Sequence, residues 1–196
     1  MAKIHQNKTN QKKPVTQQRL MNAASYYCAR FEATQARLTR VLERKVRRWL
    51  QSHDISEVQP LIAQTVERCV ALGLVDDARY ASLRTDQLLR KGQSAQRIAQ
   101  DLRHKGLESA VAAQISGQIS QTQLRQAAAA LARRRRLGPY RGPREAAAFA
   151  ADERRMLDKE VAVFARAGHA YQTAAHILAL PDADAVDAWV NEAVDD

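Results

Sequence analysis

Apolar residues recur at intervals of three and four along most of the chain, which is the period of an amphipathic α-helix. Ala95, Ile98, Ala99 and Leu102 form one such stripe. Ser94 stands immediately before it, and serine is a favoured residue at a helix N-cap. The pattern predicts a helix that begins after Ser94.

Short glycine breaks separate the predicted helices. Residues 105–107 read Lys-Gly-Leu, which combines a cation in the last helical turn, a glycine suited to the left-handed conformation and an apolar residue that packs back. Residues 91–92 and 72–74 repeat the device, so each is expected to end a helix. Asp76 or Asp77 is then expected to cap the helix that follows.

Three segments with this pattern align without gaps, at residues 30–42, 90–102 and 166–178. The first two have a capping residue, Thr34 or Ser94, at a position where the third has Ala170. Matched positions also hold an arginine, an apolar residue and a leucine: Arg30, Arg90 and Arg166; Leu38, Ile98 and Ala174; Leu42, Leu102 and Leu178.

These alignments predict an all-α protein of three tandem three-helix repeats, each resembling a helix-turn-helix unit. Tandem units contact mainly their neighbours, so an elongated, curved arrangement is expected. The predicted boundaries are a disordered basic arm at 1–18 and repeats at 19–73, 74–120 and 121–194. A helix from Gln121 to about Arg136 opens the third repeat and is followed by an Arg/Gly/Pro loop at about 133–150.

The charge is distributed unevenly along the 196 residues. All 31 lysines and arginines lie at or before Arg166, whereas six of the 21 acidic residues follow Pro181. A body with so large a positive excess is expected to associate with a polyanion or an acidic protein surface. A basic domain whose charges are merely solvated is the alternative.

Other features argue against catalysis, cofactors and membranes. Cys28 and Cys69 stand alone and are expected to be buried thiols, and His169 and His176 have no third ligand at metal spacing. No phosphate-binding glycine loop or hydrolase motif occurs, so neither an enzyme nor a cofactor is predicted. No apolar run is long enough to cross a membrane, and a cytoplasmic monomer is expected.

The aromatic residues are interpreted first as core residues, because most of them fall at core spacing. This group includes Tyr26, Phe31 and Tyr171. Tyr140 lies in the Arg/Gly/Pro segment and is the one aromatic residue expected to be exposed.

Residues 72–107 resemble the RecX family of bacterial regulatory proteins, and residues 165–178 look like its third unit. The family pattern is a Gly-Leu-apolar-Asp entry, an Arg-Lys-Gly corner, a helix with Arg-Ile and Leu-Arg, and a Lys-Gly stop. The residues that carry it are Gly73, Leu74, Val75, Asp76, Asp77, Arg79, Tyr80, Ala81, Arg90, Lys91, Gly92, Arg97, Ile98, Leu102, Arg103, Lys105, Gly106 and Leu107.

The resemblance implies a modulator of the RecA recombinase that binds the RecA nucleoprotein filament and curbs its ATPase, strand-exchange and coprotease activities. Contact with DNA is expected to be weak and non-specific at most. On this hypothesis the contact residues are Lys91, Arg97, Arg103, Lys105, Arg133, Arg134, Arg135 and Arg136. The alternative is a basic helix-turn-helix-like protein that binds DNA independently of RecA.

Overall fold

The computed structural model describes residues 14–192, and within them it holds eleven α-helices, two short 3₁₀ helices and no strand. The all-α prediction is therefore confirmed. Most of the predicted basic arm and the last acidic residues, Asp195 and Asp196, lie outside the described residues. The chain divides into two compact units, Met1–Asp77 and Ala78–Asp196, and each is described by itself.

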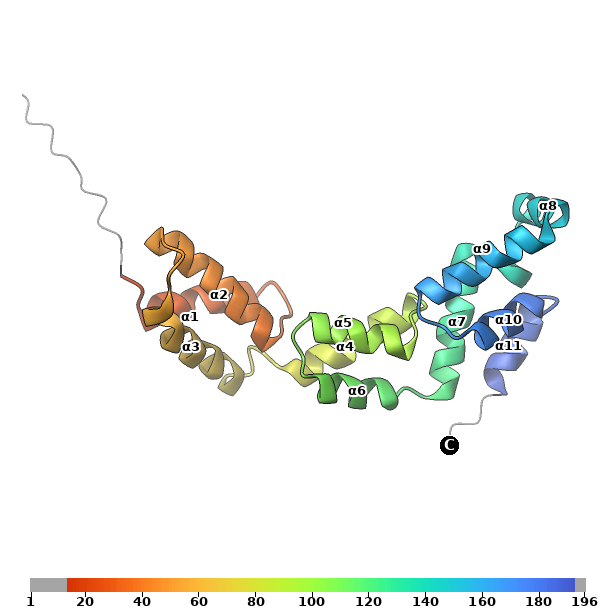
Figure 1. The fold of residues 1–196 in the computed structure, drawn as a ribbon. Coiled ribbons are helices and arrows are strands. Elements are labelled where there is room, and N and C mark those ends of the chain that lie inside the picture. The colour runs from red at the N-terminus through yellow and green to blue at the C-terminus, as the bar shows by residue number, and fades with distance from the viewer. Residues whose placement is uncertain (1–13, 193–196) are drawn as a thin grey trace, which may run out of the picture. The chain divides into compact units, whose positions relative to one another are not determined.

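The first unit contains the first three-helix repeat (Figure 1). Its helices are α1 (Gln17–Cys28), α2 (Gln35–Leu50) and α3 (Gln59–Ala71), with a 3₁₀ turn, η1 (Ser56–Val58), before α3. Their apolar faces enclose a core of buried residues that includes Leu20, Ala24, Leu38, Leu42, Val46, Ile62 and Cys69. Burial raises the pKa of the Cys69 thiol, as expected for a cysteine that serves as a core residue.

Two polar side chains fix the start of α2. The hydroxyl of Thr34 accepts a hydrogen bond from the Arg37 backbone N–H at 3.1 Å, as its capping position predicts. Asp77 also acts here, because its Oδ1 accepts the Gln35 N–H at 2.9 Å. The sequence predicted that Asp76 or Asp77 caps the helix that follows, whereas the Asp77 carboxylate satisfies an N–H donor of a helix 42 residues earlier in the chain.

The second repeat opens the second unit with α4 (Asp77–Arg90), α5 (Ala95–His104) and α6 (Ser109–Gly117). Ser94 caps α5 by accepting the Arg97 N–H at 3.2 Å. The predicted glycine stop is also present, since Gly106 N–H donates to the Arg103 carbonyl and the following N–H donates back to residue 102. Buried core residues are Ala81, Leu88, Ile98, Leu102, Leu107 and Ala112.

The third repeat is longer than the other two. Its helices are α7 (Gln121–Arg135), η2 (Gly138–Tyr140), α8 (Pro143–Ala151), α9 (Glu153–Arg166), α10 (Tyr171–Ala179) and α11 (Ala183–Asn191). In the sequence alignment α9 and α10 correspond to α4 and α5, whereas α11 packs against α7, which lies between the second repeat and these helices (Figure 1). Phe164, Ile177 and Leu131 are fully or almost fully buried between them.

The Arg/Gly/Pro segment differs from the loop expected at about 133–150. Helix α7 continues to Arg135, and Pro143 begins a new helix, α8, instead of prolonging an irregular segment. Proline suits the first turn of a helix, where its missing N–H costs nothing, and the alanines after it favour helix. The connection between α7 and α8 is therefore short, residues 136–142, and it contains the 3₁₀ turn η2.

A buried ion pair clamps that connection to α9. The Glu160 carboxylate is almost fully buried and accepts two hydrogen bonds from Arg141, at 2.8 and 2.6 Å. It also accepts the Gly138 N–H at 3.2 Å. One carboxylate therefore satisfies both the guanidinium and a backbone donor of the connecting segment.

The second and third repeats meet at their glycine corners. Ser94 N–H donates to the Ala167 carbonyl at 3.0 Å, and His169 Nε2 donates to the Gly92 carbonyl at 2.9 Å. Burial lowers the pKa of His169, so the ring stays neutral with its proton on Nε2. Gly92 has φ +75°, and a Cβ there would lie 2.7 Å from the Leu131 Cβ. We call this contact, formed by Gly92, Ser94, Ala167, Gly168 and His169, the repeat joint.

The joint yields a prediction for Gly92→Ala. The methyl group collides with α7 and the residue must hold a positive φ, which together cost roughly 2–4 kcal/mol. Urea unfolding followed by circular dichroism measures the loss. Gly117→Ala is the control, because a Cβ there meets nothing within 4 Å and its φ is ordinary. Equal stability of the two variants would contradict the close approach at the joint.

The ion pair of Glu160 yields a second prediction. Glu160→Gln keeps the size of the side chain but leaves the Arg141 charge unpaired in a poorly hydrated site, at a cost of about 3 kcal/mol. Asp187→Asn removes the exposed partner of Arg133, 3.3 Å away, and is expected to cost less than about 1 kcal/mol. Chemical denaturation of both variants tests the difference, and a smaller loss for Glu160→Gln would show that the clamp does not stabilise the fold.

Candidate partner-binding surface

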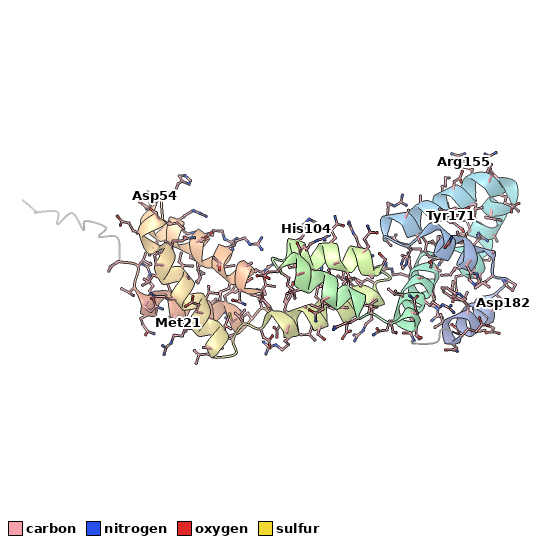
Figure 2. All side chains as sticks on the ribbon, turned by 60° about the horizontal axis from the view of Figure 1, so that its bottom comes forward. Met21, Asp54, His104, Arg155, Tyr171 and Asp182 are labelled. Atoms are coloured by element: carbon pink, nitrogen blue, oxygen red, sulfur yellow. The ribbon has the colours of Figure 1, made fainter. Side chains whose placement is uncertain are left out.

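Helix α5 presents cations to solvent, because its only acidic residue, Asp101, is paired with an arginine of α4. Arg84 on α4 forms a bidentate pair with Asp101, at 2.8 and 2.9 Å, and this pairing lowers the pKa of the carboxyl group. Arg97 and Arg103 are exposed, and Lys105 is half-buried. The outer side of α5 is therefore positive. His104 lies on this outer side, next to Arg103 (Figure 2).

The four predicted cations of the second repeat do not form one stripe. Arg103 and Lys105 are two residues apart, so they project about 200° apart around the helix axis. The stripe is instead formed by Arg97, Gln100 and His104, at intervals of three and four. Arg97 donates to the Gln100 Oε1 at 2.6 Å, which holds its guanidinium along the helix surface.

The predicted arginine run at the end of α7 is exposed along its whole length. Arg133 contacts the loop, where its guanidinium lies 5.4 Å from the Tyr140 ring centroid and 3.3 Å from Asp187. Arg134 and Arg135 have no ion-pair or hydrogen-bond partner for their side chains within residues 14–192. Tyr140 was expected to be exposed, but it is half-buried against the core of the third repeat because the 3₁₀ turn folds it inward.

Arg136 lies at a helix C-terminus in the left-handed conformation, which glycine adopts at the ends of α4, α5 and α9. It ends α7 in the left-handed conformation, with φ 55° and ψ 52°, while the next N–H donates back to the Ala132 carbonyl at 3.0 Å. Gln51 is the one other non-glycine residue with positive φ in the described part of the chain. A side chain in this conformation costs roughly 1–2 kcal/mol relative to the right-handed region.

The repeat joint brings part of the predicted set together. The corner at Gly92 packs on α7 at Leu131, and Arg134 and Arg135 lie one turn further along the same face. Lys91 adjoins this corner and is exposed. Arg97 adjoins the opposite corner, since a Cβ at Gly168 would lie 3.3 Å from the Arg97 Cβ.

We call the exposed cations around the joint the joint cluster, which consists of Lys91, Arg97, Arg134, Arg135 and Arg166. Arg103 and Lys105 lie outside it, about 9 and 12 Å further along α5 by the helical rise. Sequence reasoning missed Arg166, although its alignment with Arg90 placed it at a corner. It is the last residue of α9, directly before the joint, and its side chain is exposed.

A second basic surface, on α2 of the first unit, was also missed. Helix α2 carries six cations and one acid among 16 residues. Arg37, Arg40, Arg44 and Arg48 recur at intervals of three and four and are all exposed, and we call them the α2 stripe. The charge count of this segment alone would have identified it.

Metal-ligating side chains do not gather in the part of the chain that the structure describes. No group of three or more His, Cys, Asp or Glu residues comes together within residues 14–192 to hold a metal ion. A pocket of about 490 Å³ near the joint is lined by two histidines but by no Asp, Glu or Cys. His169 is bonded to Gly92, and His176 lies against Trp189 with ring centroids 5.1 Å apart. In the same part of the chain, no helix has both the length and the apolar composition needed to cross a membrane.

Comparison with known proteins agrees with this architecture. Residues 76–114 match the family described as "RecX, second three-helix domain", and this range covers α4, α5 and most of α6. The Regulatory protein RecX of Myxococcus xanthus is 34% identical over 165 residues, 81% of this chain and 83% of that protein. The Regulatory protein RecX of Agrobacterium fabrum is 30% identical over 168 residues, 85% of each chain.

No solved structure gives a significant match. The similarity to the Myxococcus protein nevertheless extends over most of both chains, and the three helices α4 to α6 agree with the description of the matched domain. The chain belongs to the RecX family.

Proposed function

We propose that this RecX-family protein binds the RecA nucleoprotein filament and inhibits its ATPase, strand-exchange and coprotease activities. Family membership carries the proposal, because this is the activity that the RecX resemblance implies. The protein would act by binding alone, with no bond-making step of its own.

The joint cluster suits such a role physically. Its cations come from four chain segments held together by the packed glycine corners, so the backbone positions that carry them are fixed before any partner binds. A backbone that is ordered in advance loses little conformational entropy on binding, and clustered charges raise the rate of encounter with an anionic partner. Several modest contacts, repeated along a regular filament, then add to a useful affinity.

The conformation of Arg136 also supports a binding role for the arginine run. Glycine at this position would relieve the left-handed strain, as it does at the ends of α4, α5 and α9. Strained residues that persist in a fold are often functional residues. The strain therefore favours a role for the Arg136 side chain outside the packing of the fold.

Titration of the protein into a RecA ATPase assay on single-stranded DNA tests the proposed function. ATP hydrolysis is expected to fall as the protein is added, at concentrations comparable with RecA. Unchanged hydrolysis, together with tight or sequence-selective binding to bare duplex DNA at physiological salt, would instead favour a DNA-binding protein independent of RecA.

The joint cluster yields a prediction for the triple variant Lys91→Glu, Arg97→Glu and Arg135→Glu. Its half-inhibitory concentration is expected to rise about tenfold or more, which corresponds to roughly 0.5 kcal/mol per charge. The matched control reverses three exposed cations of α9, Arg154, Arg155 and Lys159, with the same change in net charge. Equal loss in both variants would show that total charge, and not the joint cluster, governs inhibition.

Arg136→Gly is expected to separate stability from binding. Relief of the positive φ stabilises the fold, and the added freedom of the unfolded chain offsets part of the gain, leaving about 0.5–1 kcal/mol. Inhibition of RecA should weaken at the same time. Arg134→Ala is the control, because it removes an exposed helical cation without relieving strain; it should weaken inhibition with little change in stability. If Arg136→Gly were less stable than the wild type, the positive φ of Arg136 would not be a source of strain.

A further inference from the structure

The end of α1 and the residues after it expose two aromatic rings that the sequence assigned to the core, and we call this segment, residues 26–31, the aromatic turn. Tyr26 is 62% exposed and Phe31 is 54% exposed. Tyr26 lies on the side of α1 away from the buried Leu20 and Ala24, and Phe31 follows the last turn of the helix, where few neighbours remain to cover it. An exposed aromatic ring forgoes the hydrophobic stabilisation that burial would give it. Two such rings close together therefore suggest a binding surface.

Neighbouring side chains contact both rings. The Arg30 guanidinium carbon lies 3.7 Å from the Tyr26 ring centroid, which is a close cation–π contact. The Phe31 ring lies 5.1 Å from the ring of Tyr27, whose hydroxyl accepts a hydrogen bond from Arg37 Nε at 2.7 Å. The aromatic turn is therefore ordered without being buried.

The α2 stripe begins at this aromatic turn. Arg37, which contacts Tyr27, is the first of its four arginines, and Arg48 lies about 16 Å further along the helix axis. At the other end of the helix pair, Arg19 of α1 lies 3.9 Å from the Trp49 ring. These two contacts show that α1 and α2 run antiparallel, with the aromatic turn at one end of the arginine track.

The geometry points to a binding site for single-stranded nucleic acid on the first repeat, formed by the aromatic turn and the α2 stripe. Unpaired bases would stack on Tyr26 and Phe31, and the phosphates that follow would pair with Arg37, Arg44 and Arg48. Stacking platforms beside a cationic track are how proteins bind single strands without sequence preference. A duplex hides the faces of its bases, and the carboxylates of an acidic protein surface would pair with the arginines without using the rings, so both fit the aromatic turn less well.

This site goes beyond the proposed function because it requires no RecA. Fluorescence anisotropy with a labelled oligothymidine of about 20 nucleotides, measured with the full chain and without RecA, tests it directly. The double variant Tyr26→Leu and Phe31→Leu keeps apolar side chains at exposed positions, so the fold is preserved while stacking is lost. Affinity is expected to fall about 10- to 100-fold, within the range measured for one or two stacked bases.

Tyr171→Leu is the matched control, since this tyrosine of α10 is 69% exposed but lies in the second unit (Figure 2). It should leave the affinity unchanged. A second variant, Arg44→Gln with Arg48→Gln, should reduce the slope of log affinity against log salt by about 1.4, the value for two phosphate contacts on a single strand. The aromatic variant should leave that slope unchanged.

Several outcomes would overturn the site. They are absence of binding by the wild-type chain, equal loss in Tyr171→Leu, an unaffected aromatic variant, or equal affinity for duplex and single strand. Each is independent of the RecA ATPase assay, so failure of this site and failure of the proposed function are distinguishable. Melting curves of all variants, expected to match that of the wild type, show that the comparison concerns binding.

Discussion

The contact between two glycine corners determines which side chains of the second unit can act together. At the repeat joint the Ser94 N–H donates to the Ala167 carbonyl, and the His169 imidazole donates to the Gly92 carbonyl. Both corners require glycine, because α7 leaves no room for a Cβ at Gly92 and Ser94 leaves none at Gly168. Without this approach the arginines of α5, α7 and α9 would belong to separate helices. With it, the helices that carry these arginines are packed together.

The composition of the helices explains why the cations are available. The cores of the repeats are small and are filled mainly by Leu, Ile, Val and Ala, which leaves the remaining positions of each helix to polar residues. Acids that face the interior or the caps are already paired, as with Asp101, Glu160 and Asp77. Cations therefore outnumber acids among the solvent-facing side chains. On α2 they follow one face of a single helix, whereas those of the joint cluster come from four chain segments.

Much of the local structure follows from the sequence because its causes are local. The helix stops at Gly92 and Gly106 depend on a backbone conformation that only glycine adopts readily, and the Thr34 and Ser94 caps depend on a hydroxyl three residues before the donor. The bond from Gln35 to Asp77 could not be predicted, since it joins residues 42 apart. The approach of Gly92 to α7 is equally long-range.

Exposure of aromatic residues was harder to predict than the helices themselves. Helical periodicity distinguishes inward from outward positions in the middle of a helix, but at an end the number of neighbouring elements decides burial. Tyr26 and Phe31 were therefore wrongly assigned to the core, and Tyr140 was wrongly assigned to solvent, because the structure of the intervening turns was unknown. The α2 stripe, in contrast, could be predicted from the sequence, because six cations and one acid occur within 16 residues and four of the arginines recur at helical spacing.

The proposed function requires that exposed cations on the helical repeats make the contacts to the RecA filament. The most direct test is the affinity of the wild-type protein for preformed RecA filaments between 50 and 200 mM salt. Salt screens contacts between exposed charges, so the affinity is expected to fall steeply and continuously, at least tenfold across this range. An affinity that is unchanged across the same range would contradict it.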